Sequence, residues 1–187
     1  MQASRIALAF SLAALACWGG APSRAAGPAP AGVATPGPAA DAGIVVSGPG
    51  GDSTLTAEAL AALPSVPVSV PAGTAPGARG RTFEGPLLWT VLAHAGAVDP
   101  SKHQGNVRGT VVLTGQDGYT AVLALGELSP EFEGKPVIVA LRMDGRPLDP
   151  GHLRVVVPGD KRGGRGVHDL ARIGVATAAP APQHAAH

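Results

Sequence analysis

The sequence predicts an α+β domain that is mainly β, with a mixed, barrel-like sheet and short helices at its periphery. Short runs rich in Val, Leu and Ile recur from residue 44 to residue 176, and most are too short for a helix of several turns. Asp-Gly pairs at 117–118 and 144–145 separate some of these runs, which is typical of tight turns between strands. Apolar residues at helical spacing are confined to a few segments.

Several short strands are expected because each segment is rich in β-branched residues or alternates apolar and polar residues. In chain order the expected strands cover residues 44–46, 66–70, 110–114, 119–124, 137–141, 153–157 and 173–176. The Asp-Gly turns indicate that some of the strand pairing is local and antiparallel.

Two helices are expected between these strands. Thr56 has a residue type that favours the N-cap position of the first helix, over 57–63. The second helix covers 86–95, where Pro86 suits the first turn and Gly96 suits the position after the last turn. The stretch 71–81 is Gly/Ala/Pro-rich and is expected to be a loop. Shorter helical turns are expected at 125–131 and 167–172.

The two ends of the chain are predicted to lie outside this domain. Arg5 precedes the apolar run 6–18, which is too short for a comfortable membrane span, and small residues follow at a typical cleavage spacing. We therefore divide the chain into a signal peptide (1–25), a disordered Pro/Ala/Gly linker (26–42), the domain (43–177) and a disordered tail (178–187). This predicts an exported protein, periplasmic or secreted, without a transmembrane span in its mature form. Lipoprotein anchoring through Cys17, which follows a weak lipobox, is the alternative.

The charge of the whole molecule restricts the kinds of partner that are expected. The formal net charge is +1, which gives no argument for nucleic acid, so any binding of an anion must be local. Histidines occur without metal-ligand spacing, and no serine lies in a G-x-S-x-G context. No structural metal and no catalytic residue is therefore predicted.

The loop 158–168 (PGDKRGGRGVH) is the first candidate binding site. Three cations lie within five residues, and neighbouring glycines let backbone N–H groups approach an anion closely. The residues concerned are Lys161, Arg162, Gly163, Gly164 and Arg165. The alternative is a solvated basic hairpin without a ligand.

The turn that carries Asp117 and Tyr119 is the second candidate. The alternative for this pair is a turn aspartate followed by a half-buried tyrosine whose hydroxyl finds a hydrogen-bond partner. Sequence alone does not decide between the two interpretations.

The order of several short motifs resembles one known family. These motifs are LTAEALAALP at 55–64, FEGPLLWTVLAHAG at 83–96, DGY at 117–119, DGRPL at 144–148, and VVPGD at 156–160 before a basic loop and an I-x-V strand. Over about residues 43–177 the chain resembles the molybdopterin-binding oxidoreductase domain of the sulfite oxidase family. The resemblance implies a pterin cofactor whose phosphate is held by Lys161, Arg162 and Arg165 with the Gly163–Gly164 backbone, and whose pocket is lined by Asp117 and Tyr119.

The same resemblance implies a protein cysteine that completes the coordination of molybdenum. It is expected between the first valine-rich strand and the F-x-G motif, but residues 68–82 contain none, and Cys17 is the only cysteine of the sequence. Ser69 or Thr74 would be a poor substitute, because a hydroxyl ligates a soft metal differently from a thiolate. We therefore expect an exported molybdopterin-dependent oxidoreductase-like protein without sulfite-oxidase-type catalysis. The alternative is a non-catalytic periplasmic module that binds another protein or a small anionic molecule.

Overall fold

A computed structural model of the chain describes residues 43–72, 79–102, 107–160 and 162–177. All of them belong to one unit, Pro36–His187; the other unit, Met1–Thr35, lies outside the described residues. The predictions for segments 1–25, 26–42 and 178–187 also fall outside. No helix of the described part is long and apolar enough to cross a membrane.

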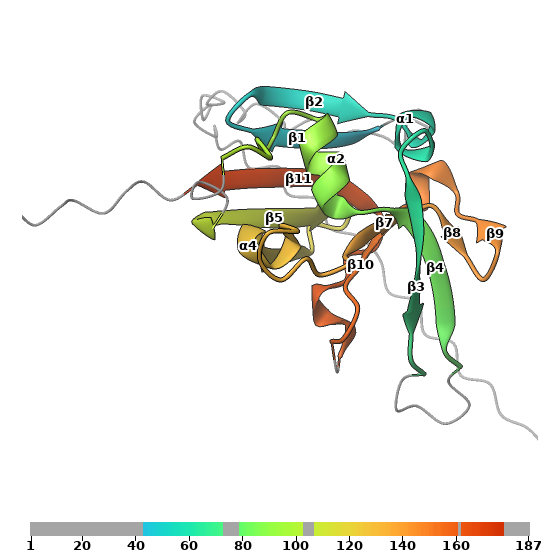
Figure 1. Cartoon of the computed structure of the whole chain (residues 1–187). Coiled ribbons are helices and arrows are strands. Elements are labelled where there is room, and N and C mark those ends of the chain that lie inside the picture. The colour runs from blue at the N-terminus through green and yellow to red at the C-terminus, as the bar shows by residue number, and fades with distance from the viewer. Residues whose placement is uncertain (1–42, 73–78, 103–106, 161, 178–187) are drawn as a thin grey trace, which may run out of the picture. The chain divides into compact units, whose positions relative to one another are not determined.

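The predicted α+β class is confirmed, since strands dominate and the helices are short (Figure 1). The strands are β1 (Ile44–Gly48), β2 (Gly51–Leu55), β3 (Ser65–Val70), β4 (Arg81–Pro86), β5 (Gly109–Gly115), β6 (Thr120–Ala124), β7 (Ile138–Ala140), β8 (Arg142–Met143), β9 (Arg146–Pro147), β10 (Arg154–Val156) and β11 (Leu170–Thr177). The helices are α1 (Ala57–Ala61), α2 (Leu88–His94) and α4 (Leu125–Leu128), with 3₁₀ turns η1 (Pro150–His152) and η2 (Gly163–Arg165).

The largest sheet has five strands in the order β2-β1-β11-β5-β6. The pair β1–β11 is parallel and the other three pairs are antiparallel, so the sheet is mixed. Helix α2 crosses one face of this sheet (Figure 1), and its residues Leu88, Val91 and Leu92 are fully buried. They pack with Val111 and Ile173 of the sheet in the main hydrophobic core, and burial of this kind is the main favourable term in folding.

A second, four-stranded sheet has the order β3-β4-β8-β9, and the short pair β10-β7 lies beside it. The backbones of β4 and β7 approach each other closely, and two hydrogen bonds join them at this point. The Leu141 N–H donates to the Glu84 carbonyl (2.8 Å), and the Leu88 N–H donates to the Val137 carbonyl (2.8 Å). A Cβ on Gly85 would lie 1.9 Å from the Val139 carbonyl oxygen. The glycine of the F-x-G motif is therefore required for this crossing.

Several local predictions are confirmed. The Thr56 hydroxyl accepts from the Ala59 N–H (3.2 Å), as an N-cap does. Gly96 has φ 70°, the left-handed conformation that ends α2. Asp144 and Gly145 both have positive φ, as a type I′ hairpin turn requires, and they join β8 to β9.

Two predictions about elements are wrong, and some strands were not predicted. Strand β4 was not predicted, and Pro86 closes this strand instead of opening α2, because pairing with β3 and β8 outweighs its weak strand pattern. The segment 167–172, expected to be a helical turn, begins β11, because its backbone pairs with β5. Strand β2 was not predicted, since its sequence GDSTL is polar, and it forms an outer strand of the large sheet.

Candidate functional site

The structure brings the two predicted site segments together. Tyr119 follows the turn between β5 and β6, and its hydroxyl donates to the Gly164 carbonyl oxygen at 2.5 Å. The Asp117 carboxylate accepts from the Tyr119 N–H (2.9 Å) and so holds the turn. Tyr119 therefore fixes the position of the basic loop relative to the large sheet.

Arg165 is held by carboxylates of the protein itself. Its Nη2 and Nε atoms donate to the two oxygens of Asp160 (2.6 and 3.0 Å), and its Nη1 donates to Glu127 Oε2 of α4 (3.0 Å). The hydrogen bond from Arg165 lowers the pKa of Asp160, and the bond to Asp160 raises the pKa of Arg165 against the effect of burial. In this arrangement Arg165 clamps the loop onto α4; its role as a phosphate ligand stays a prediction.

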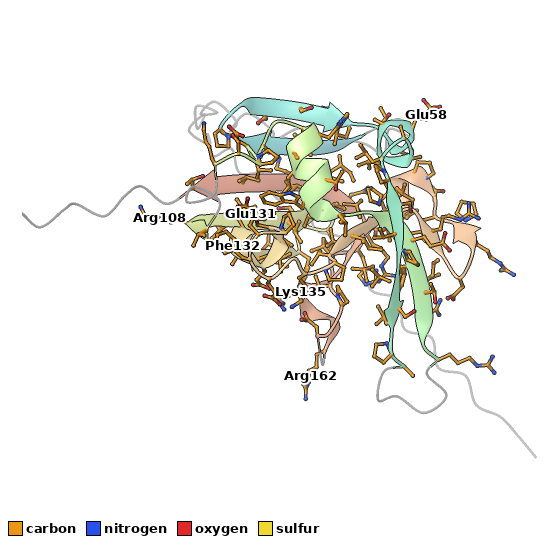
Figure 2. All side chains as sticks on the ribbon, in the orientation of Figure 1. Glu58, Arg108, Glu131, Phe132, Lys135 and Arg162 are labelled. Carbon is orange, nitrogen blue, oxygen red and sulfur yellow. The ribbon has the colours of Figure 1, made fainter. Side chains whose placement is uncertain are left out.

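Arg162, Gly163 and Gly164 of the basic loop are exposed to solvent. Figure 2 shows Arg162 at the outer tip of the loop, with its side chain pointing away from the strands. Gly163 and Gly164 have free space where a Cβ would lie, so a ligand can approach their backbone. Lys161 lies outside the described residues. The roles of these four residues as phosphate ligands also stay predictions.

Sequence reasoning missed Arg154, the first residue of β10. Its guanidinium lies over the ring of Phe83, 5.1 Å from the centroid, and its Nη2 donates to His168 Nε2 (2.5 Å). Among the described residues no carboxylate lies within ion-pair distance of Arg154. An isolated arginine at the start of a strand carries no sequence signal, because its importance comes from partners that other segments supply.

The environment of Arg154 is rich in positive charge. Burial lowers the pKa of Arg154, and the charge of Arg81 lowers it further. Asp169 acts in the opposite direction, but its carboxylate is hydrogen-bonded to His152 Nδ1 (2.8 Å). Arg81, Arg154 and His168, which we call the cationic cluster, thus place two guanidinium groups and an imidazole together. Arg81 is paired with Asp144 (3.8 Å), whereas no described carboxylate lies within ion-pair distance of Arg154.

His168 contributes to this cluster as an acceptor. Burial and then the charge of Arg154 lower the pKa of His168 from its ordinary value of 6.5. The guanidinium donates to Nε2, so this nitrogen is unprotonated and the ring proton lies on Nδ1. A partly buried guanidinium that stacks on an aromatic ring and has unused donors is well suited to grip an oxyanion.

The described residues do not fit a molybdenum that needs a protein thiolate. The β3–β4 hairpin offers hydroxyls instead, with Ser69 Oγ and Thr82 Oγ1 facing each other at 3.5 Å. Thr74, the other substitute considered, lies outside the described residues. No group of three or more His, Cys, Asp or Glu side chains in the described ranges is placed to hold a metal ion. These donors therefore do not supply the soft ligand that such a centre requires.

Comparison with known proteins gives one match. The family model for the oxidoreductase molybdopterin binding domain matches residues 53–184, which is most of the chain. No curated protein matches the chain. The matched range includes the four-stranded sheet, the cationic cluster, the basic loop and the five-stranded sheet apart from β1 and the first two residues of β2.

Proposed function

Because the chain belongs to the oxidoreductase molybdopterin-binding domain family, we propose that it uses this fold to bind an anionic group at the cationic cluster, without the chemistry of a cysteine-liganded molybdenum. The observation that carries the proposal is the state of Arg154. Its guanidinium is partly buried on Phe83 and bonded to a neutral His168, and it lies beside a second cation, Arg81. Arg81 is paired with Asp144, but no described carboxylate lies within ion-pair distance of Arg154, so a bound anion would supply the counter-charge of this partly buried guanidinium.

The sequence of the domain argues against the metal-centred reaction. The segment where the family resemblance places the cysteine ligand contains no sulfur atom, and the hairpin that flanks it presents Ser69 and Thr82 hydroxyls. We therefore assign no residue of this chain to coordination of molybdenum and no residue to a redox step.

The chemistry of the cluster fits a phosphate, sulfate or carboxylate group. A guanidinium presents planar, paired donors that match two oxygens of such a group, and charge-assisted hydrogen bonds are about twice as strong as neutral ones. The phosphate of a pterin is one anion of this class. It would be held by Arg154 and Arg81, with the predicted contacts from Arg162 and the Gly163–Gly164 backbone beside them.

Calorimetric titration with inorganic phosphate tests the proposal. We expect Arg154→Ala to weaken phosphate binding by about tenfold to a hundredfold, because a charge-assisted hydrogen bond contributes about 1.5–3 kcal/mol. Arg172→Ala is the matched control, since Arg172 contacts Asp52 (3.7 Å) and Ser47 (2.9 Å) on β1 and β2. Equal affinities of the wild type and Arg154→Ala would overturn the assignment of the site.

Metal analysis separates this function from that of a molybdenum oxidoreductase. Protein purified from cells that make the complete cofactor is expected to contain no stoichiometric molybdenum. Near-stoichiometric molybdenum together with sulfite-oxidising turnover would show that the redox reading is correct and the proposal wrong.

Export belongs to the same proposal. It is supported by Arg5, the apolar run 6–18 and the small residues that follow, which together have the form of a signal peptide. Mass spectrometry of the mature N-terminus tests it: a free Ala25, Ala26 or Gly27 supports ordinary cleavage, and a lipid-modified Cys17 supports anchoring. An intact N-terminus on protein recovered from the cytoplasm would contradict export.

A further inference from the structure

We infer that the anion held by the cationic cluster carries an apolar body, and that this body lies in a cavity beside the β8–β9 hairpin. The inference rests on the proposed function, because the cluster is to hold the charged head of the ligand. It names the ligand class as amphiphilic anions, such as organic carboxylates with an alkyl or aromatic body, in preference to compact oxyanions.

The register of the second sheet places the relevant side chains on one face. Phe83 of β4 lies opposite Met143 of β8, and Met143 lies opposite Arg146 of β9. Directly opposite residues of paired strands point to the same side of a sheet. Arg81 precedes Phe83 by two residues and so shares this face. The partly buried Met143 therefore forms an apolar strip between Arg81 and Arg146, next to Phe83, which is itself buried beneath the guanidinium of Arg154.

A cavity of about 480 Å³ continues this strip. It is lined by Arg81, Met143, Asp144, Arg146, Pro147 and Leu148. Its volume lies within the range of about 300–1,000 Å³ that is usual for small-molecule sites. Apolar groups of Met143, Pro147 and Leu148 form part of its wall, and Leu148 and Met143 pack against the buried cluster that contains Phe83.

The charges at the cavity favour an anion. Two guanidinium groups and one carboxylate line it. The Asp144 carboxylate accepts from the Thr82 N–H (2.9 Å) and pairs with Arg81 (3.8 Å), so Arg146 supplies the excess positive charge. Arg146 forms no ion pair with another described residue. Its aliphatic stem can cover an apolar ligand while its charge remains in water.

Arg81 connects the cavity with the cationic cluster. Its Nη1 atom lies 3.2 Å from Met143 Sδ inside the cavity wall, while its charge acts on Arg154 above Phe83. An anionic head between Arg81 and Arg154 would therefore leave its body lying in the cavity on Met143, Pro147 and Leu148, because Phe83 itself is buried. A compact oxyanion would occupy the head position alone and leave these apolar groups without a ligand.

Titration of the full chain with acetate, hexanoate and inorganic phosphate tests this inference. Burial of a methylene group strengthens binding by up to about fourfold, so hexanoate is expected to bind at least about tenfold more tightly than acetate. Met143→Gln and Arg146→Ala are expected to reduce this preference at least about threefold and to leave phosphate affinity unchanged. The matched controls, Val122→Gln on the exposed face of β6 and Arg142→Ala, are expected to keep it, because Arg142 lies toward Glu84 (3.7 Å) and the Gly145 carbonyl (2.6 Å).

The outcomes separate the inference from the function on which it rests. Phosphate binding that depends on Arg154, without any preference for hexanoate, would retain the anion site and refute the apolar body. A preference that persists in both Met143→Gln and Arg146→Ala would refute the placement in this cavity. Absence of binding by all three anions would refute the proposed function and the inference together.

Discussion

Replacement of Gly85 by alanine is expected to unfold the crossing of β4 and β7 on which the site is built. The added Cβ would lie 1.9 Å from the Val139 carbonyl oxygen and 2.8 Å from its carbon. Carbon–oxygen contacts in proteins are usually about 3.3 Å or longer. The two backbones would have to separate by roughly 1.4 Å, the difference between these distances.

This separation would break the hydrogen bonds that join the two strands. The bonds from Leu141 N–H to Glu84 O and from Leu88 N–H to Val137 O are both 2.8 Å long. Loss of each contributes about 0.5–1.5 kcal/mol, and insertion of a methyl group into a packed region costs about 1–3 kcal/mol. We expect a total loss of about 2–6 kcal/mol, a large part of the stability of a typical domain.

Urea unfolding followed by the fluorescence of Trp89 on α2 measures this loss. Gly151→Ala is the matched control, because its Cβ would lie 3.5 Å from Asp149 Oδ1, an ordinary contact, and its φ is not positive. The control is expected to change stability by less than about 0.5 kcal/mol. A loss below about 1 kcal/mol in Gly85→Ala would refute the argument that close backbone approach requires this glycine.

Two further predictions concern charged residues of the site. Arg165→Ala is expected to destabilise the domain by about 1–3 kcal/mol at pH 7, because it leaves Asp160 without its hydrogen-bonded partner, whereas Glu127 keeps its ion pair with Lys135 (3.7 Å). Since Arg165 lowers the pKa of Asp160, the stability from this pair is present above the ordinary value of 3.8 and is lost as the pH falls through the lowered pKa. Denaturation at pH 7 and near pH 3 should therefore show a smaller difference in unfolding free energy between variant and wild type in acid. An unchanged difference would contradict the ion-pair explanation. Because the pKa of His168 is lowered from 6.5, the ring is neutral at pH 7, and the free protein loses stability as the pH falls below 6.5. Protonation of His168 adds a positive charge to the site. Sulfate binding is therefore expected to strengthen in acid in the wild type and not in His168→Gln. Titrations from pH 7.5 to pH 5 measure this effect, and a flat profile for the wild type would remove His168 from the site.

Local signals predicted the parts of the fold that are determined by a few neighbouring residues. The Thr56 cap and the Asp144–Gly145 turn each depend on conformational preferences of the residues themselves, and the structure confirms both. Strand β4 could not be predicted in this way. Its sequence RTFEGP has a weak strand pattern, and it becomes a strand because β3 and β8 pair with its two edges.

The candidate site shows the same division. The contact of Tyr119 with the basic loop could not be predicted, because no local pattern indicates the bond from its hydroxyl to the Gly164 carbonyl. The carboxylate of Glu127 lies 38 residues before Arg165 in the chain and reaches it only in the folded state. Arg154 was missed for the same reason, because Phe83 and His168 come from different strands or loops.

Anion binding and metal chemistry depend on different parts of this domain. Arg154 is placed by the pairing of β10 with β7, and its partner His168 lies just before β11, which the large sheet holds. Only Arg81 of the cluster belongs to the hairpin from which the cysteine is absent. A domain of this family can therefore lack the thiolate and still keep the strand pairings that hold a guanidinium on Phe83. Binding measurements on Arg154 and metal analysis consequently test separable properties, and a result for one does not decide the other.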